Sequence, residues 1–552
     1  MPTIDIVIGT LNRLARRPVA EHDLQYAKAG VESKSGTTWR IEISDTNRPD
    51  LWSVEGVARV LRGIYKKDRG CPRLPVKKAS RKIFVDTHLK SVRPYIAGFA
   101  ATNMRITDDD LKDLVQLQEK LAENFGKKRE KISIGIYNCD GLTFPLSYTV
   151  APPGFSFVPL DSQQPQTLRE ILDKHPKGKA YGSILAARSL LPIFIDAKKQ
   201  VLSFPPIVNS NDLGRVVPGM RNVFVEVTGT DHKAVLLATN IVAYALHDRG
   251  ATIEPVATVY PYKTTYGKIV AAPYAFGASL AVEQSLVGKV LGITVPDTEL
   301  KRLLESMQYD VALGKGKLIV RIPDYRNDIM HAYDVIEDVA IAYGYAKIAS
   351  QETSFFTAGA AAPLNAFRLK ATTLMIGHGF QEILSPVLSN TRNLEGNMLV
   401  PAHAIEIANP MTETYSAVRS WLLPSLLSFL TKNMHVDYPQ FIFEVGECAV
   451  REGGETRTET KLAACITGTG IGYQNLSPVV HSLLTLLGID HRFEKHYHPS
   501  FLNGRTARII ADKALIGIVG EIHPAVLNSW GLEKPVVACE LDVSALHALQ
   551  AR

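Results

Sequence analysis

Apolar and polar positions follow two periods along this chain, one typical of strands and the other of helices. The segment 40–43, Arg-Ile-Glu-Ile, alternates strictly and predicts a strand. After the polar loop 45–50, apolar residues recur every three or four positions from Ser53 onward, which predicts an amphipathic helix. Its apolar stripe consists of Val54, Val57, Ala58, Leu61 and Ile64.

A second unit of this kind lies near the middle of the chain. The segment 221–231 predicts a strand that runs into a helix cap, and Thr230 or Asp231 can cap the helix that follows it. Gly250 suits the end of that helix, because glycine readily adopts the backbone conformation that ends helices. The order strand, helix, strand predicts a mixed α/β domain here.

The last half of the chain divides into a small module and a larger domain. Between residues 268 and 345 we expect a helix from Pro296, a hairpin around 314–317 and a final helix that stops at Gly344, together a winged-helix-like module. The uncharged stretch 353–363 looks like a linker. Beyond it, long strands with few helices favour a largely antiparallel sheet with helices on one face. The expected helices are 365–376, 422–433 and 477–487, and the expected strands are 382–386, 405–408, 440–445, 507–510, 515–520 and 536–541.

Composition places the chain among ordinary globular proteins. Its 552 residues suffice for three or four domains, and 46% are hydrophobic while 21% are charged. The net charge of +7 is compatible with a nucleic-acid partner but does not by itself indicate one. Five scattered cysteines contain no C-x-x-C pair, which argues against a zinc knuckle or a disulfide framework. We find no signal peptide or membrane-spanning stretch, and expect a cytoplasmic protein without a membrane partner.

The densest group of acidic residues precedes and opens the last helix of the small module. Asp334, Glu337 and Asp338 are spaced i, i+3, i+4 and should share one face of that helix. Their charges should then repel by roughly 3 kcal/mol per pair at an effective dielectric of ~20. A cation is therefore expected nearby, either Mg²⁺, which prefers such oxygen ligands, or a basic partner. The alternative is an acidic first helical turn paired with Arg326 or His331. The four residues are Asp328, Asp334, Glu337 and Asp338.

Two segments come close to nucleotide-binding signatures of class II aminoacyl-tRNA synthetases. The run 468–475 has the spacing G-x-G-x-G, but Gln474 and Asn475 stand where Glu and Arg are needed. Arg457 and Glu459 form only a bare R-x-E. The arginine that would hold ATP phosphates is thus missing, and neither segment alone is specific.

Longer segments carry a specific resemblance. Residues 45–59 (DTNRPDLWSVEGVAR) and 322–345 (IPDYRNDIMHAYDVIEDVAIAYGY), followed by 503–505, 517–524 and 540–543, resemble the phenylalanyl-tRNA synthetase beta subunit family in order over nearly the whole chain. The length is similar to that of the shorter, archaeal form.

The resemblance implies an α+β multidomain fold with four parts. These are an N-terminal domain (1–75), a mixed α/β editing domain (76–266), a small magnesium-bearing winged-helix-like module (267–346) and a catalytic-like domain (355–552). The last would have a class II synthetase-like antiparallel sheet with helices, and would be inactive.

It also implies an α₂β₂ enzyme that joins phenylalanine to tRNA(Phe) with ATP, the alpha subunit holding the synthetic site. This chain would contact the alpha subunit, support the tRNA and hydrolyse mischarged tyrosyl-tRNA(Phe). By position, the family's Mg²⁺ ligands correspond to Asp328, Asp334, Glu337 and Asp338. Its editing-pocket residues correspond to Ser203, Glu226 and Thr228, with Glu226 where related chains often have Asp.

Two other classes of function remain open on the residues. A stand-alone RNA-binding scaffold would bind RNA without a partner and with a steep salt dependence. A magnesium-dependent phosphohydrolase would use the acidic helix as its active site and act on a phosphate ester unaided.

Overall fold

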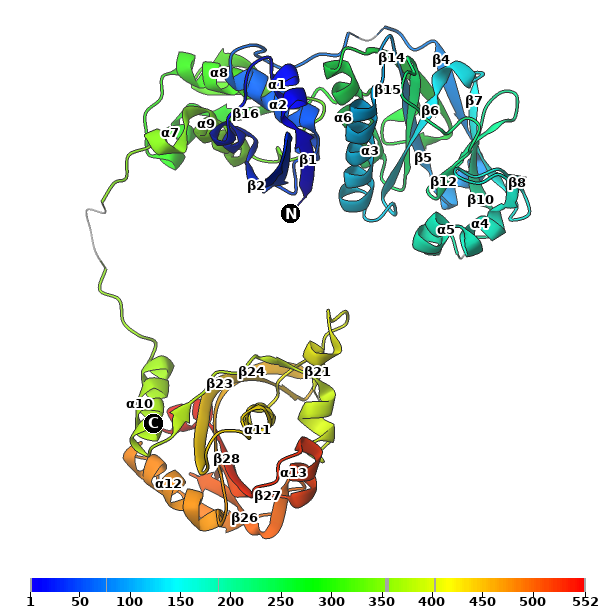
Figure 1. The fold of residues 1–552 in the computed structure, drawn as a ribbon. Helices are drawn as coiled ribbons and strands as arrows, with labels where there is room; N and C mark the ends of the chain where they lie inside the picture. The colour runs from blue at the N-terminus through cyan, green and yellow to red at the C-terminus, as the bar shows by residue number, and fades with distance from the viewer. Residues whose placement is uncertain (1, 76, 187, 353–356, 402–403, 551–552) are drawn as a thin grey trace. The chain divides into compact units, whose positions relative to one another are not determined.

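The computed structural model describes residues 2–75, 77–186, 188–352, 357–401 and 404–550. The chain folds as two compact units, residues 1–352 and 353–552. The boundary between them coincides with the start of the predicted linker, of which residues 353–356 lie outside the described part. Figure 1 shows the two units by colour, blue to green for the first and yellow-green to red for the second.

The first unit begins with a small antiparallel sheet in the order β1-β3-β2, covered by α1 and α2. The predicted strand and helix are both confirmed, and Ser53 caps α2 by accepting the N–H of Gly56 at 3.1 Å. The elements are β1 (Thr3–Val7), α1 (Ile8–Ala15), β2 (Ala29–Ser35), β3 (Thr38–Ile43) and α2 (Val54–Ile64).

A ten-stranded mixed sheet forms the largest layer of the first unit, in the order β12-β11-β10-β7-β4-β14-β5-β13-β6, with β15 beside β14. Its strands are β4 (Arg81–Val85), β5 (Tyr95–Thr102), β6 (Ile132–Asn138), β7 (Leu146–Ala151), β10 (Leu191–Ile195), β11 (Val201–Phe204), β12 (Val208–Asn209), β13 (Val223–Gly229), β14 (Thr252–Thr264) and β15 (Gly267–Ala272). The helices around it are α3 (Asp108–Lys120), α4 (Leu168–Lys174), α5 (Pro176–Tyr181) and α6 (His232–Asp248), and a two-stranded ribbon consists of β8 (Ser156–Phe157) and β9 (Gln166–Thr167).

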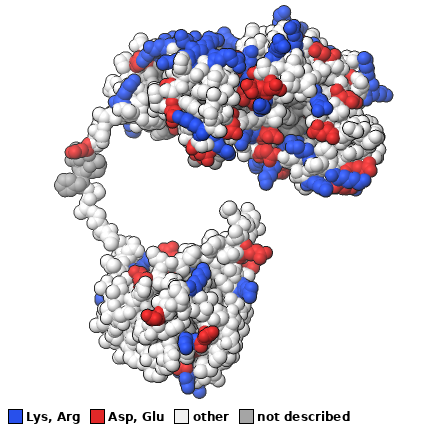
Figure 2. All heavy atoms as spheres, viewed as in Figure 1, with Lys and Arg blue, Asp and Glu red and all other residues white. Residues whose placement is uncertain are grey.

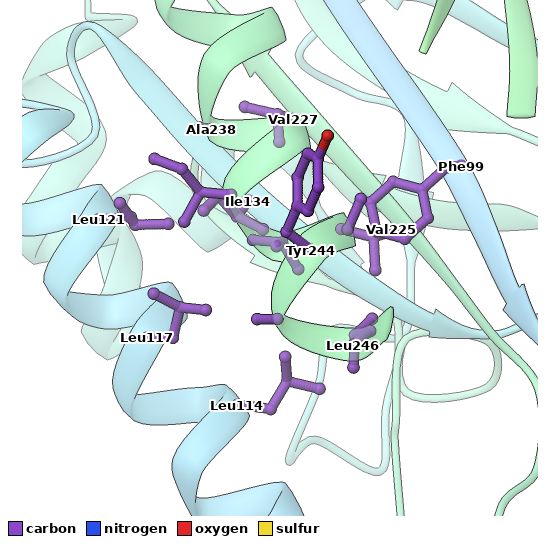
Figure 3. Packing of buried hydrophobic residues seen from close by; sticks show 14 of the residues in the cluster. Phe99, Leu114, Leu117, Leu121, Ile134, Val225, Val227, Ala238, Tyr244 and Leu246 are labelled. Atoms are coloured by element: carbon purple, nitrogen blue, oxygen red, sulfur yellow. The ribbon is translucent and has the colours of Figure 1, made fainter. Parts of the chain in front are cut away.

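Helix α6 packs on β5 and β13, the two adjacent central strands. Figure 3 shows Val225 and Val227 of β13 pointing into the apolar layer between the sheet, α6 and α3. The predicted capping of this helix is confirmed for Asp231, whose Oδ1 accepts the N–H of Ala234 at 3.0 Å. One apolar cluster contains residues from Ile4 to Tyr325 and therefore crosses the predicted domain boundaries at residues 75 and 266. These two boundaries stay predictions.

The small module has its own apolar cluster and a three-stranded sheet in the order β16-β18-β17. The predicted helix, hairpin and final helix are present, the last ending before Gly344. The elements are β16 (Ser279–Glu283), α7 (Gln284–Leu291), α8 (Asp297–Ser306), β17 (Asp310–Gly314), β18 (Lys317–Arg321) and α9 (Ala332–Tyr343).

The second unit contains a seven-stranded sheet in the order β19-β23-β24-β28-β27-β26-β25, antiparallel except for the pair β19–β23. Its elements are α10 (Pro363–Gly377), β19 (Gln381–Glu382), α11 (Leu423–Lys432), β23 (Gln440–Glu452), β24 (Glu455–Thr467), α12 (Tyr473–Leu486), β25 (Arg492–Lys495), β26 (Phe501–Ala511), β27 (Ala514–Ile522), α13 (Pro524–Trp530), β28 (Val536–Asp542) and α14 (Val543–Gln550). A second, three-stranded sheet consists of β20 (Leu388–Ser389), β22 (Ala417–Val418) and β21 (Ile405–Glu406).

Helices cover both faces of this sheet rather than one face as predicted, because Leu462 and Ala464 of β24 pack with α12 while the alternate residues Ala463 and Cys465 pack with α11. Two strands also differ from the expectation. Strand β24 was not predicted, because its first half, Glu455–Lys461, is polar and partly exposed and gives no apolar signal. The strand predicted at 382–386 is only the two-residue β19, after which the N–H of Ile383 still donates to the Phe443 carbonyl at 2.8 Å. No helix in the described part of the chain is both long and apolar enough to cross a membrane.

Candidate functional site

Strand β13 places one acidic side chain in the interior of the first unit. Every residue of β13 is buried, and its alternate residues point to opposite faces of the sheet. Val225 and Val227 face α6, so Glu226 and Thr228 point to the other face. Glu226 is only 2% exposed and lies between two glycines, Gly98 on β5 and Gly135 on β6.

One oxygen of the Glu226 carboxylate is held by a tyrosine. The hydroxyl of Tyr137 lies 2.8 Å from Glu226 Oε1 and 2.8 Å from Ser203 Oγ. A phenol has one proton, so donating it to the carboxylate leaves the Tyr137 oxygen to accept from Ser203. Burial raises the pKa of Tyr137 well above its ordinary value, which keeps this donor protonated.

The other oxygen, Glu226 Oε2, is buried and has no hydrogen-bond partner among the described residues. Burial raises the pKa of Glu226 to about 7, while the Tyr137 hydroxyl and the charge of Arg93 act in the opposite direction. A buried polar atom without a partner costs roughly 1–3 kcal/mol, more when charged. Such an atom points to a group that is supplied from outside the chain.

That carboxylate lines a cavity of about 390 Å³. The size falls within the range of small-molecule sites. Its wall is mixed: the apolar part includes Ile134, Ile136, Pro205, Ile207 and Val208, and the carboxylates of Glu119 and Asp161 also line it. Cationic and imidazole side chains also line it, namely Arg129, His175, Lys177 and Arg215.

Of the three residues predicted for this pocket, Ser203 and Glu226 line the cavity and Thr228 does not. Thr228 is fully buried, with its Oγ1 2.9 Å from Ser133 Oγ and 3.1 Å from Arg93 Nε. Ser133 lines the cavity in its place. Thr228 therefore acts on the site only through its neighbours.

Sequence reasoning missed the strand that faces Glu226. In β6 three isoleucines alternate with Ser133, Gly135 and Tyr137, a period of two that marks an apolar face and a polar face. Gly135 stands directly opposite Glu226. A Cβ at Gly135 would lie 2.1 Å from the Tyr137 hydroxyl and 2.6 Å from Glu226 Oε1, so only glycine leaves room for their bond.

Arg93 is the second residue that the sequence did not single out. It is 1% exposed and donates to the Thr228 carbonyl at 2.8 Å and to Ser133 Oγ at 3.2 Å. Burial lowers the pKa of Arg93 to about 10. The guanidinium supplies positive charge near Glu226 without a direct hydrogen bond to its carboxylate in the described structure.

The acidic residues of the small module are held by several different partners. Arg326 binds both oxygens of Asp328, at 2.7 and 2.5 Å, and also reaches Asp338 Oδ2 at 2.9 Å. Tyr309 donates to the same Asp338 oxygen at 2.5 Å. The guanidiniums of Arg326 and Arg48 hold the pKa of Asp328 well below its ordinary value despite burial.

The other two acids lie apart from that group. Asp334 Oδ2 accepts the N–H groups of Met330 and His331 at 2.8 and 2.7 Å, as the acid of a helix capping box. Glu337 is exposed and pairs with Lys28 at 2.8 Å.

The expectation that residues 334, 337 and 338 share one face of the helix needs correction. Asp338 lies on the buried side of α9, where Tyr309 and Arg326 satisfy it, whereas Glu337 is exposed. The described residues contain no group of three or more His, Cys, Asp or Glu side chains placed to hold a metal ion. As placed, the four acids do not fit a magnesium ion, and the predicted site stays a prediction.

The glycine-spaced segment of the second unit starts a helix. Asn475 Oδ1 accepts the N–H of Gly472 at 2.9 Å, so α12 begins at Tyr473 rather than at the predicted 477. Arg457 pairs with Glu459 at 2.7 Å.

Comparison with known proteins decides the family. The phenylalanine–tRNA ligase beta subunit of Pyrococcus horikoshii is 38% identical to this chain over 559 residues, which cover 99% of this chain and all of that protein. The chain belongs to the phenylalanine–tRNA ligase beta subunit family. The resemblance seen in the sequence, including its archaeal type, is thereby confirmed.

Other comparisons place the family's domains along the chain. A family model described as "Phenylalanyl tRNA synthetase beta chain CLM domain" matches residues 352–543, and one described as "tRNA synthetase B5 domain" matches residues 280–345. The beta subunit from Treponema pallidum is 37% identical, over 92% of this chain and 86% of its own length. The crystal structure of an N-terminal fragment of the Pyrococcus horikoshii beta subunit superposes with a TM-score of 0.60 at 38% identity, covering 62% of this chain and all of the fragment.

In this chain, the cavity at Glu226 and the acids of the B5 domain are thus two separate features. Glu226 lines the cavity and has a buried oxygen without a hydrogen-bond partner among the described residues, whereas the B5 acids are bound by protein groups. The cavity is the stronger candidate for chemistry.

Proposed function

We propose that this chain is the proofreading subunit of an α₂β₂ phenylalanine–tRNA ligase. Its alpha partner attaches phenylalanine to tRNA(Phe) with ATP, and this chain removes tyrosine that was attached by mistake. The observation that carries the proposal is the buried Oε2 of Glu226, which has no hydrogen-bond partner among the described residues and belongs to a side chain that lines the cavity. Family membership supplies the context of the tRNA ligase.

Tyrosine and phenylalanine differ by one hydroxyl group. An apolar synthetic site rejects an added hydroxyl by only ~10², whereas a site built to hydrogen-bond that hydroxyl rejects the amino acid lacking it by roughly 10⁴–10⁵. The carboxylate of Glu226 accepts the proton of the phenol. With phenylalanine bound, Oε2 would stay buried and unpaired, so phenylalanyl-tRNA is spared.

The rest of the site positions this acceptor. Tyr137 holds Oε1, which leaves Oε2 as the oxygen directed to the ligand, and Ser203 holds Tyr137 in turn. The apolar part of the wall contacts the aromatic ring. The cationic side chains that line the cavity suit the phosphate-bearing 3′ end of the tRNA.

Hydrolysis proceeds by addition of water to the ester carbonyl. The bond between the carbonyl carbon and the ribose oxygen breaks, the ribose oxygen takes a proton, and free tyrosine and tRNA are released. Ser133 and Ser203 both line the cavity, but no hydrogen bond joins either of them to His175 in the described residues. We therefore infer that positioned water, assisted by the tRNA's own ribose hydroxyl, is the nucleophile rather than a serine.

The test is deacylation of tyrosyl-tRNA(Phe) by the assembled enzyme with Glu226→Ala. The variant should lose discrimination and hydrolyse tyrosyl-tRNA at least about 10²-fold more slowly. Thr228→Ala is a matched control, because Thr228 is equally buried on the same strand but does not line the cavity. Unchanged deacylation by the Glu226 variant, with phenylalanyl-tRNA still spared, would exclude Glu226 from the site.

A further inference from the structure

The first unit carries a strongly basic segment after α2. Residues 66–82 contain eight Lys and Arg and one acid, Asp68. The side chains of Lys66, Lys67 and Arg69 are exposed. None of these three has an ion-pair partner in the described part of the chain.

Helix α1 adds a further cation at the same place. Arg16 pairs with Asp68 at 3.0 Å, and Arg62 pairs with the other oxygen of Asp68 at 2.7 Å, so the single acid of the segment is already neutralised twice. The guanidinium of Arg17 lies 4.2 Å from the centre of the Tyr65 ring, which places it beside Lys66. We call Arg17, Lys66, Lys67 and Arg69 the basic surface.

Figure 2 shows Lys and Arg side chains gathered over the upper edge of the first unit, where Figure 1 places α1, α2 and α8. Past residue 76 the exposed Lys77, Lys78 and Lys82 continue the run along the chain. Helix α8 lies against α2, but its cations are paired internally, Arg302 with Glu299 and Lys301 with Glu305. Beside Arg302, Lys66 also lowers the pKa of Glu299, so the charge of Lys66 is compensated in part, and Lys67 and Arg69 are cations of the segment without an acidic partner in the described part of the chain.

We propose that the basic surface binds the phosphate backbone of tRNA. The inference rests on the proposed function only for the identity of the RNA. Closely spaced exposed cations match the dense row of phosphates on an RNA strand, and binding releases condensed counterions. Contacts of this kind fix position without reading base sequence.

A lipid surface is a poorer fit to the same residues. Membrane-binding segments combine cations with exposed apolar anchors. Within residues 2–75 and 77–82, no large hydrophobic side chain is highly exposed, and the first such residue is Phe84. Strongly hydrated lysines without an apolar anchor therefore fit the phosphates of a dissolved RNA better than they fit a membrane surface.

The experiment compares two charge-matched variants of the full-length chain in complex with its alpha partner. The first is Lys66→Asn with Lys67→Gln and Arg69→Gln. Asparagine is chosen at position 66 because its φ is 62°, which asparagine tolerates better than most residues. The control is Lys289→Gln with Lys315→Gln and Lys317→Gln, which removes three equally exposed cations from the small module.

Binding of uncharged tRNA(Phe) is measured by fluorescence anisotropy between 50 and 300 mM NaCl. For the first variant we expect the slope of log Kd against log salt to fall by about two to three, and Kd at 100 mM salt to rise at least about tenfold. The control should match the unmodified enzyme. An RNA of unrelated sequence and equal length should lose affinity by the same factor.

Three results would overturn the proposal. The first is an unchanged slope in the first variant, and the second is an equal loss in the control, which would show that only net charge matters. The third is binding to vesicles with 30% phosphatidylserine that the first variant abolishes while tRNA binding is unchanged. A failure of tyrosyl-tRNA deacylation by the unmodified enzyme would refute the proofreading function but leave this binding test intact.

Discussion

At the level of single side chains, the buried surroundings of Glu226 disfavour its ionised form. Burial raises its pKa from an ordinary 4.5 to about 7. Below pH 4.5 the carboxyl is neutral in the folded and the unfolded chain, so folding is unaffected. As pH rises toward 7 the unfolded chain ionises first, and the folded state loses stability, by up to about 3 kcal/mol above pH 7.

Glu226→Gln should therefore raise the free energy of unfolding at pH 8 and leave it nearly unchanged at pH 4.5. The gain at pH 8 should be on the order of 1–3 kcal/mol, because the amide avoids the ionisation cost but leaves its NH₂ group unpaired. Urea denaturation of the purified chain at both pH values measures this difference. An equal effect at the two pH values would contradict the raised pKa.

Deacylation of tyrosyl-tRNA should follow the ionised form of the same group. We expect the rate to fall as pH decreases through about 7, since protonated Glu226 no longer accepts the phenol proton. Tyr137→Phe removes a donor that lowers the pKa of Glu226, so this variant should shift the profile to higher pH. A lower rate without any shift would indicate that Tyr137 is needed only for packing.

At the level of secondary structure, caps and apolar stripes were predicted well from the sequence, and exposed or isolated segments were not. Helix α6 was predicted with its cap at Thr230 or Asp231, and the cap is Asp231; cap and stripe are both local signals. Strand β24 was missed because its polar half is stabilised by pairing with β23, a distant partner in space rather than a local preference.

The same contrast holds for the candidate site. Ser203 and Glu226 were identified through family resemblance, whereas Tyr137 and Gly135 were not identified although β6 carries a clear alternating pattern. Their role depends on the register that sets Gly135 opposite Glu226, and register between strands cannot be derived from one sequence. The partners of the acids on α9 likewise come from elsewhere in the chain, such as Lys28 and Tyr309.

Helix α9 offers a test of the magnesium prediction. Asp338→Asn weakens a buried contact with Arg326, so we expect a loss of about 3 kcal/mol in the free energy of unfolding. Asp334→Asn should cost less than about 1 kcal/mol, because the amide oxygen can still accept the N–H groups of Met330 and His331. If protein groups alone hold these acids, 5 mM Mg²⁺ should leave both values unchanged. A Mg²⁺-dependent rise in Tm that both variants lose would instead establish the metal site.

At the level of the whole molecule, we predict that this chain alone does not form aminoacyl-adenylate. Gln474 and Asn475 stand where a synthetase of class II needs Glu and Arg, and Asn475 is used to cap α12. The purified chain should show no phenylalanine-dependent exchange between ATP and pyrophosphate, and exchange should appear when the alpha subunit is added. Robust exchange by the lone chain would place synthesis in this subunit.

Under the proposed function, the glycine opposite Glu226 makes proofreading separable from protein synthesis by a single carbon atom. A methyl group at position 135 would occupy the space between the Tyr137 hydroxyl and the carboxylate, far in sequence from the second unit. A cell whose only copy carries Gly135→Ala should grow normally in balanced medium and accumulate tyrosine at phenylalanine codons when tyrosine is in excess. Peptide mass spectrometry of its proteome would count those substitutions, and translational fidelity in such a cell would depend on the supply of amino acids.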